Sequence, residues 1–313
     1  MAGTRRDFFQ AAATAAALTG ATLTSQAQAP GNTPQAGGAP RQGGPQVQAP
    51  RMKFGAFEIS RLVCGCNCFY GYSHFNQTLN DLMREYYTPE QVCNVLHECN
   101  RYGINAYNFI VNERSNADLD RFTAEGGAMH LIVQGQGDQP EFIKKYKPMA
   151  IYNQGELTDR SYQCAELDTV KEWGKRNKDR GLMVGVGTHK PEVIAEIESQ
   201  GWGVDFYAGC VYNRTRTQDE WKQVLGGELV EMQGECYLQS DPPRMYAVMR
   251  KTTKPCFAFK ILAAGRVANA ERAFQLAYES IKPTDGVFIG LFPKMKDEIR
   301  ENAGRVHRLL AGA

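Results

Sequence analysis

The stretch that decides the fold is LMVGVGTHKPEVIAEIESQGWGVDFYAGCV, residues 182–211. It opens with an apolar run at 182–187 and continues with a helix-like segment at 191–200, which begins with a proline. It closes with a second apolar run at 204–211. Parallel strands that are covered on both faces have such nearly continuous apolar sequences. The stretch therefore predicts a strand–helix–strand unit with parallel strands.

The same alternation recurs between residues 52 and 313. Six further strands are predicted at 62–66, 104–109, 131–134, 150–153, 256–262 and 286–292. Further helices are predicted at 89–102, 117–125, 140–145, 162–180, 243–251, 268–281 and 296–310. About eight strand–helix units over roughly 250 residues predict one α/β domain, 52–313, folded as a (β/α)₈ TIM barrel. An open doubly wound sheet is the alternative, but no glycine-rich dinucleotide fingerprint follows the first strand.

Residues 1–29 predict a twin-arginine signal peptide. Arg5 and Arg6 precede an alanine-rich apolar run that is too short to span a bilayer, and small residues favour cleavage after Ala27 or Ala29. We therefore expect the Tat translocase as a partner during export and a periplasmic or other extracytoplasmic location. Residues 30–51 are rich in Pro, Gly and Gln, which predicts a flexible, disordered linker.

The composition of the chain gives no sign of a nucleic-acid partner, a membrane span or a disulfide scaffold. The net charge of +2 implies no basic face large enough for nucleic acid, and no later segment has the apolar length of a membrane span. The nine cysteines are an odd number, and several lie inside predicted strands or helices. We therefore expect no disulfide scaffold, no nucleic-acid partner and no stable membrane span.

In a barrel of this kind the chemistry lies at the C-terminal ends of the strands, and polar side chains gather there. His189 and Lys260 are the candidate catalytic residues. The candidate substrate-binding residues are Asn67, His74, Asn108, Gln134, Gln136, Asn153, Tyr212 and Arg266. Amide and tyrosine side chains suit a hydroxyl-rich ligand, so we expect a small-molecule substrate such as a sugar or another polyhydroxylated carbonyl compound.

His189 is a candidate acid or base because histidine titrates near neutrality. Gly185 and Gly187 precede it at a spacing of two, on the same face of the predicted strand. We expect these small residues to leave room below a bound ligand. The alternative is a histidine that only caps the helix beginning at Pro191.

Lys260 interrupts an otherwise apolar run, and lysine is almost never fully buried without a partner. In the barrel mouth it would stabilise an enolate or alkoxide, or form a Schiff base with a carbonyl substrate. The alternative is a structural ion pair with Asp205 or Glu113. Nearby, Arg266 would present its guanidinium to an anion, or would be an ordinary surface side chain in a turn.

A metal site is the weaker hypothesis. Cys64, Cys66 and Cys68 are soft ligands with His74 nearby, but alternate residues of a strand lie about 7 Å apart. Only Cys66, Cys68 and His74 would converge. We therefore assign no metal ligand, and the cofactor stays open between none, a divalent metal and NADP.

Three segments carry a resemblance to a known family. Residues 57–65 look like the first strand of aldo/keto reductases, residues 102–108 are similar to their second strand, and residues 286–303 resemble their last strand and helix. The resemblance implies an aldo/keto-reductase-like TIM barrel in an uncharacterised, exported group. The family uses an Asp, Tyr, Lys and His tetrad with NADPH. This chain has Asn108, Gln134 and Asn153 near three of those positions, so the tetrad is not retained.

Three functions are compatible with these residues. The first is a carbohydrate-type lyase, isomerase or epimerase that works by acid/base chemistry, with His189 as acid or base and Lys260 as its electrophilic or proton-transfer partner. The second is an NADP-dependent oxidoreductase whose Lys260, Arg266 and Lys294 bind phosphates. The third is a ligand-binding barrel without catalysis.

Overall fold

The computed structural model describes residues 47–135, 137–227 and 234–311. The predicted signal peptide 1–29, residues 30–46 of the predicted linker, and Gln136 lie outside these residues. Residues 47–51, at the end of the predicted linker, lie against the barrel. Ala49 is buried, and its backbone N–H donates a hydrogen bond to the carbonyl of Tyr102 (2.9 Å).

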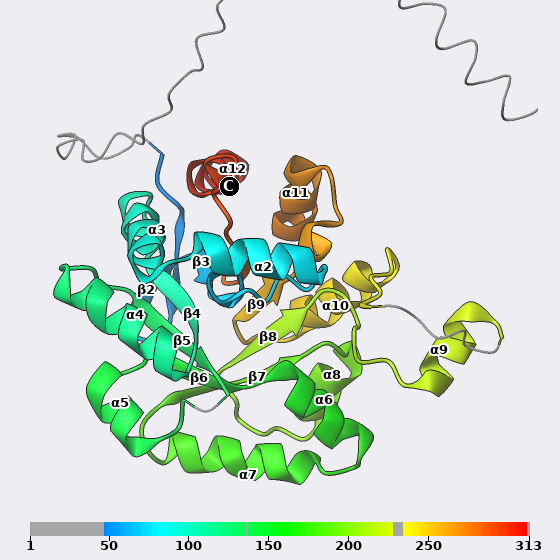
Figure 1. Ribbon diagram of the computed structural model, residues 1–313. Coiled ribbons are helices and arrows are strands. Elements are labelled where there is room, and N and C mark those ends of the chain that lie inside the picture. Colours follow the sequence, from blue (N-terminus) through cyan, green and yellow to red (C-terminus); the bar gives the residue numbers. More distant parts are fainter. Residues whose placement is uncertain (1–46, 136, 228–233, 312–313) are drawn as a thin grey trace, which may run out of the picture. The chain divides into compact units, whose positions relative to one another are not determined.

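Eight parallel strands close into a barrel in the order β10-β3-β4-β5-β6-β7-β8-β9 (Figure 1). Each lies within or beside a run predicted from the sequence, so the TIM barrel is confirmed and the open sheet is excluded. Their bounds are β3 (Leu62–Gly65), β4 (Ala106–Ile110), β5 (His130–Gln134), β6 (Ala150–Asn153), β7 (Met183–Thr188), β8 (Phe206–Cys210), β9 (Cys256–Phe259) and β10 (Gly286–Gly290).

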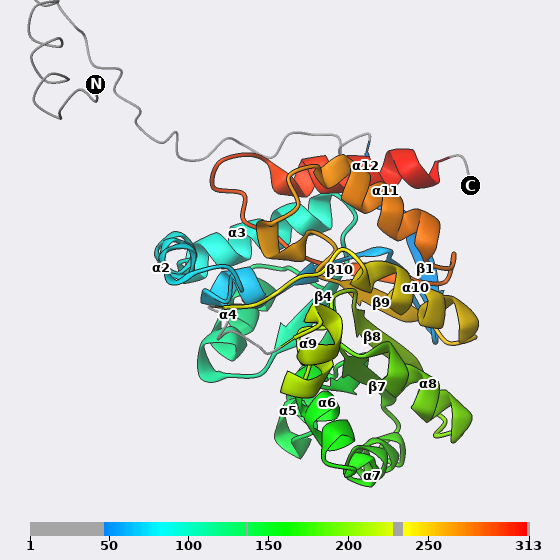
Figure 2. The ribbon, with the colours of Figure 1, turned by 90° about the vertical axis from the view of Figure 1, so that its right-hand side faces the viewer.

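Helices cover the outside of the barrel, and α11 and α12 lie side by side in both views (Figures 1 and 2). Within the described residues, no helix is long and apolar enough to cross a bilayer. The α-helices are α2 (Gln77–Tyr86), α3 (Pro89–Arg101), α4 (Glu113–Ala124), α5 (Pro140–Tyr146), α6 (Gly155–Gln163), α7 (Leu167–Lys178), α8 (Pro191–Ser199), α9 (Gln218–Leu225), α10 (Asp241–Lys251), α11 (Ala270–Ser280) and α12 (Glu298–Leu310).

The single helix predicted at 162–180 is wrong. The structure has two helices there, α6 and α7, and Ala165 between them adopts a left-handed backbone with φ of 58°. Such a conformation interrupts the helical hydrogen-bond ladder. Alanine seldom adopts this conformation. Because the break occurs at an alanine and not at a Gly or Pro, the sequence gives no sign of it.

The barrel interior is filled by side chains, as in other barrels of this size. Phe257 and Phe288 stack with ring centroids 4.6 Å apart, and Phe206 packs edge-on against Phe257. A short hairpin of β1 (Arg51–Phe54) and β2 (Phe57–Ser60), not predicted from the sequence, closes the end where the strands begin. Its Phe54 is fully buried and contacts both Phe206 and Phe257 edge-on.

Two aspartates fix the barrel at that same end. Asp205, just before β8, accepts a hydrogen bond from the backbone N–H of Val184 in β7 (2.7 Å). Asp285, just before β10, accepts one from the N–H of Cys256 in β9 (2.8 Å). Each carboxylate therefore accepts a backbone hydrogen bond from the neighbouring strand, near the residue where that strand begins.

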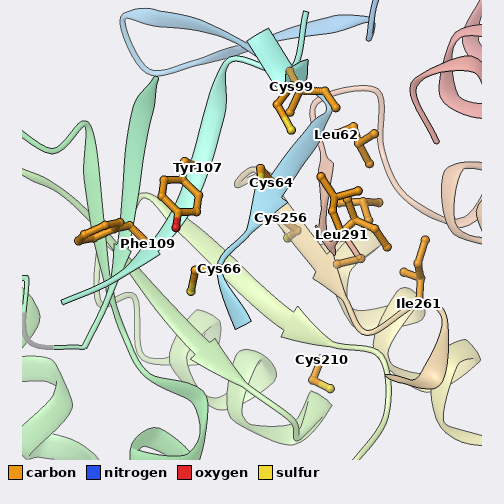
Figure 3. Packing of buried hydrophobic residues seen from close by; sticks show 14 of the residues in the cluster. Leu62, Cys64, Cys66, Cys99, Tyr107, Phe109, Cys210, Cys256, Ile261 and Leu291 are labelled. Carbon is orange, nitrogen blue, oxygen red and sulfur yellow. The ribbon is translucent and has the colours of Figure 1, made fainter. Parts of the chain in front are cut away.

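A second apolar layer lies between the strands and the helices. Figure 3 shows Leu62 and Cys64 of β3 in this layer, with Cys99 of α3 beside them. Cys64 and Cys99 are fully buried, and each is a free thiol. They fill space as small hydrophobic side chains.

Candidate active site at the mouth of the barrel

A cavity of about 280 Å³ lies at the C-terminal ends of β3, β9 and β10. Its wall is mainly apolar and includes Leu79, Met83, Phe259, Leu262, Phe288, Ile289 and Phe292. The polar side chains that line it are Asn67, Ser73, His74, Asn108, Lys260 and Glu298. Four of the predicted site residues, Asn67, His74, Asn108 and Lys260, are therefore brought together. An apolar pocket with a few convergent polar groups is the usual form of a small-molecule site.

Lys260 follows the last residue of β9 and is partly buried. Burial, and next the positive charge of Arg214, lower the pKa of Lys260 to about 8. Within the described residues its Nζ forms no hydrogen bond or ion pair. Asp205, one partner considered from the sequence, instead binds Lys178 (2.9 Å), and Glu113 forms no ion pair with Lys260. The ammonium group therefore faces the cavity without a protein partner in the described part of the chain.

Backbone strain gathers around this cavity. His74, Lys260, Ala263 and Ala264 adopt left-handed conformations, with φ of 57°, 61°, 48° and 52°. Such angles cost about 1–3 kcal/mol for residues other than glycine, and they persist where the surrounding structure imposes them. The two loops that follow β3 and β9 are therefore held in costly conformations at the mouth.

His74 is held in a network that crosses the mouth. Its Nδ1 lies 2.8 Å from Oε1 of Glu235, and the amide nitrogen of Asn67 lies 3.1 Å from its Nε2. These contacts fit a neutral ring that donates from Nδ1 and accepts at Nε2. Burial lowers the pKa of His74, and this effect outweighs the hydrogen bond that His74 donates to Glu235, which would raise it. His74 is therefore neutral near pH 7 and is oriented by Glu235.

Glu235 also binds Arg214, whose Nε donates to Oε2 (2.8 Å). Burial alone would raise the pKa of Glu235, but hydrogen bonds from His74 and Tyr237 and the charge of Arg214 hold it well below the usual range. The carboxylate of Glu235 stays ionised, and its negative charge balances the positive charge of Arg214. Arg214 in turn approaches Nε2 of His189 with its Nη1 (3.3 Å).

His189 does not line this cavity. Its Nδ1 binds Oδ2 of the fully buried Asp159 (2.7 Å), and its Nε2 faces Arg214. The side chain of His189 is only 4% exposed. Asp159 also accepts hydrogen bonds from the hydroxyls of Thr188 and Thr215. Both ring nitrogens of His189 are thus engaged within the protein.

The expected space below His189 is absent, which corrects that prediction. A Cβ atom on Gly185 would lie 2.5 Å from the ring of Phe206, and one on Gly187 would lie 2.9 Å from the carbonyl oxygen of Asn153. Gly185 therefore makes room for an aromatic ring, and Gly187 allows the neighbouring backbone to approach closely. The two glycines thus serve packing of the core rather than ligand binding.

Of the remaining predicted residues that the structure describes, Gln134, Asn153 and Tyr212 do not line the cavity. Gln134 contacts the sulfur of Cys66 (3.7 Å), and Asn153 accepts from the hydroxyl of Thr158 (2.9 Å). Tyr212 packs edge-on against Tyr237. Gln136 lies outside the described residues.

Arg266 connects the loops that surround the mouth. Its guanidinium lies over the rings of both Phe75 (4.9 Å) and Tyr237 (4.4 Å), and it donates to the carbonyl of His74 (2.9 Å). Cation–π contacts with two rings and this hydrogen bond hold the loops together. Arg266 is therefore placed as a structural connector at the rim.

Sequence reasoning missed four charged residues of this region: Asp159, Arg214, Glu235 and Glu298. Glu298 begins α12, and its Oε2 accepts from the N–H of Phe292 (2.8 Å). Burial raises the pKa of Glu298. Glu298 lines the cavity. Its carboxylate takes up a proton more readily than an exposed glutamate does.

The residues of the weak metal hypothesis do not assemble. Within the described residues no group of three or more His, Cys, Asp or Glu side chains is placed to hold a metal ion. β3 ends at Gly65, and Cys68 lies in a short 3₁₀ helix, η1 (Asn67–Tyr70), so strand alternation does not continue to it. Burial raises the pKa of Cys66 and Cys68 to about 12, which keeps both thiols protonated.

The titration of Lys260 predicts a pH-dependent stability. Its folded-state pKa of about 8 lies below its ordinary value of 10.5, so between these values the unfolded chain binds the extra proton. The free energy of unfolding of the wild type should therefore rise as pH increases from 8 to 10.5, by up to about 3 kcal/mol. Urea denaturation of the wild type and Lys260→Met over pH 7–10 would measure this, since only the wild type should gain. Parallel curves for the two proteins would contradict it.

Similarity to known proteins is found among solved structures. No protein-family model matches the chain, and no curated protein matches it. A sugar phosphate isomerase/epimerase from Parabacteroides distasonis is similar over 80% of this chain and 94% of that chain, with 12% sequence identity and a TM-score of 0.35. The resemblance to aldo/keto reductases is not shown by any of these findings. The barrel fold of this chain is established by its own closed order of parallel strands.

Proposed function

We propose that the protein is an enzyme that transfers a proton on a small carbonyl compound, in the class of carbohydrate-type isomerases, epimerases and lyases. The observation that carries this proposal is Lys260. Its ammonium faces the cavity without a partner among the described residues, in surroundings that make its charge costly. Charged groups in water-poor sites stabilise developing negative charge strongly. Lys260 would bind the carbonyl oxygen and stabilise the enolate formed when a neighbouring C–H bond is broken.

Three side chains would surround that reaction. Asn108 already accepts a hydrogen bond from the hydroxyl of Tyr152 (3.0 Å), which leaves its amide N–H groups for a substrate hydroxyl. Glu298 would accept and return the proton, because burial raises its pKa toward neutral pH and so makes it a better base than an exposed glutamate. His74, fixed by Glu235, would orient a second hydroxyl.

His189 has a different role in this proposal. Both of its ring nitrogens are engaged, and it does not line the cavity. It would act as a positioning residue that holds Arg214, which holds Glu235 and through it His74. A direct acid/base role for His189 would require Arg214 to move away from its Nε2, because Nδ1 can stay bound to Asp159 during proton transfer.

Deuterium exchange measures proton transfer at the carbon beside a carbonyl group, and the assay does not require the natural substrate to be known. The purified protein is incubated in D₂O with dihydroxyacetone, glyceraldehyde, erythrulose, xylulose and 4-hydroxybutan-2-one, and ¹H NMR measures loss of the signal beside each carbonyl. We expect enzyme-dependent exchange in at least one compound. Exchange should be lost in Lys260→Met and kept in Lys294→Met, an exposed lysine outside the cavity. Binding of these compounds without exchange would instead indicate a binding protein.

The alternative NADP-dependent reductase finds less support. The three cations expected to meet phosphates are dispersed: Lys260 lines the cavity, Arg266 lies between two aromatic rings, and Lys294 lines a separate surface groove. These residues do not form one dinucleotide site, so we derive no step through NADP. Titration with NADPH monitored by fluorescence would revive this alternative if it showed saturable binding.

A further inference from the structure

We propose that Lys260 forms an imine with an aldehyde or ketone that carries an apolar substituent. This inference rests on the proposed function and deepens it, because it makes the lysine a covalent group and specifies the substrate. Its basis is the position of Lys260: a primary amine at a largely apolar cavity in the barrel mouth, with no ion-pair partner in the described residues. An imine-forming lysine needs these features.

The first requirement is a neutral amine. Burial and the nearby Arg214 lower the pKa of Lys260 to about 8, so about one molecule in ten carries the unprotonated amine at pH 7. An ion pair with a carboxylate would have the opposite effect, and Glu235 is instead bound by Arg214 and His74. The network across the mouth therefore pairs Glu235 with other groups, and the nearby charges of Glu235 and Glu156 only partly offset the lowering of the pKa of Lys260.

The second requirement is the absence of a competing nucleophile in the same cavity. Cys66 and Cys68 also line it, but burial raises the pKa of both thiols to about 12. The reactive thiolate is therefore scarce near pH 7. The hydroxyl of Ser73 donates to Oδ1 of Asn80 (2.6 Å) and has no base beside it. Among the amine, thiol and serine side chains described in the lining, Lys260 is therefore the one available as a nucleophile.

The chemistry of the wall defines the substrate. Apolar lining residues Phe259, Leu262, Phe288 and Phe292 belong to or follow β9 and β10, whereas Asn67, His74 and Asn108 belong to or follow β3 and β4. A ligand with hydroxyl groups all round would leave some of them against apolar atoms without hydrogen bonds, which is costly. A carbonyl compound with hydroxyls on one side and a hydrocarbon portion on the other satisfies both sets of lining residues.

The step balances with groups that the chain holds. The lone pair of Nζ attacks the carbonyl carbon, and the C=O pair moves to oxygen. One proton moves from nitrogen to that oxygen. Glu298, in its protonated form, donates a second proton to the hydroxyl, which leaves as water while the C=N bond forms. The products are a protonated imine, water and the Glu298 carboxylate, and no oxidant or reductant takes part.

Borohydride trapping tests the imine directly. The purified protein is incubated at pH 7.5 with 4-hydroxybutan-2-one or dihydroxyacetone, treated with sodium borohydride, and studied by intact mass and peptide mapping. We expect one adduct per chain, heavier by the mass of the probe less one oxygen atom and located on Lys260. 4-Hydroxybutan-2-one should label several-fold faster than dihydroxyacetone. Lys260→Met and Lys260→Arg should lose the adduct, and Lys294→Met should keep it.

The outcomes separate the two proposals. Adducts spread evenly over exposed lysines, with the same yield in Lys260→Met, would overturn the imine. Exchange of deuterium without trapping on Lys260 would also overturn it, while leaving the proposed function intact. Trapping on Lys260 without exchange would support the imine and remove proton transfer. Mapping the adduct in the wild-type protein does not depend on whether the variants fold.

Discussion

Replacing Lys260 by methionine is expected to lower the rate of deuterium exchange at least about 1,000-fold. The variant loses the group that would bind the carbonyl oxygen, and positioned acid/base and electrostatic groups typically contribute factors of this size. Stability should not fall with activity. Methionine is of similar length, carries no charge to desolvate, and has the same left-handed backbone to adopt. We expect its free energy of unfolding at pH 7 to equal or exceed that of the wild type.

The exchange assay and urea denaturation should be run on the same preparations. Lys294→Met is the matched control, because it removes an exposed lysine from the same face while leaving the cavity unchanged. A variant at position 260 that loses stability and activity together would show a structural role. A variant that retains full exchange would remove Lys260 from the reaction.

The largest expected effect on stability comes from Arg216. Its side chain and that of Asp241 are 2% and 3% exposed, and they form a buried ion pair between the loop after β8 and the start of α10. Nη1 of Arg216 donates to Oδ2 of Asp241 (3.0 Å) and to the carbonyl of Asn213 (2.7 Å). Arg216→Met would leave the carboxylate buried with only the N–H of Asn213 as donor. We expect a loss of about 3–5 kcal/mol in the free energy of unfolding.

A double-mutant cycle identifies the cause of that loss. Arg216→Met combined with Asp241→Leu removes both charges, and breaking a buried pair costs far more than replacing it with apolar groups. The double variant should recover most of the lost stability in urea denaturation. If the double variant is at least as unstable as Arg216→Met alone, packing of Arg216 on Trp221 (4.9 Å) explains the loss instead.

The strands of the barrel could be predicted because each is covered on both faces, so its sequence is apolar almost throughout. The hairpin of β1 and β2 could not, because its four-residue strands have too few residues for a reliable alternation. α9 was not predicted, because strand and helix periodicity alone does not reveal it. Thr217 and Glu220 form a capping box at its start, and a Thr followed three residues later by a Glu is a sequence pattern that indicates the beginning of a helix.

The candidate site was only partly predictable. Lys260 was visible because a charge within an apolar strand is unusual. Asp159 and Glu235 were not, because their significance depends on partners brought together by the fold: His189 is 30 residues from Asp159, and Arg214 is 21 residues from Glu235. Arg214 itself lies in a loop after β8, where neither strand nor helix periodicity indicates the direction of a side chain.

The hairpin across the end of the barrel where the strands begin has a kinetic consequence. Phe54 and the aromatic rings that it contacts fill the barrel interior at that end, and the cavity lies at the opposite end, where the strands finish. In the proposed enzyme, substrate and product would both pass through the mouth. A product that lingers there would block the next molecule of substrate, so we expect inhibition by product to be competitive, and opening of the rim held by Arg266 would govern how quickly each cycle ends.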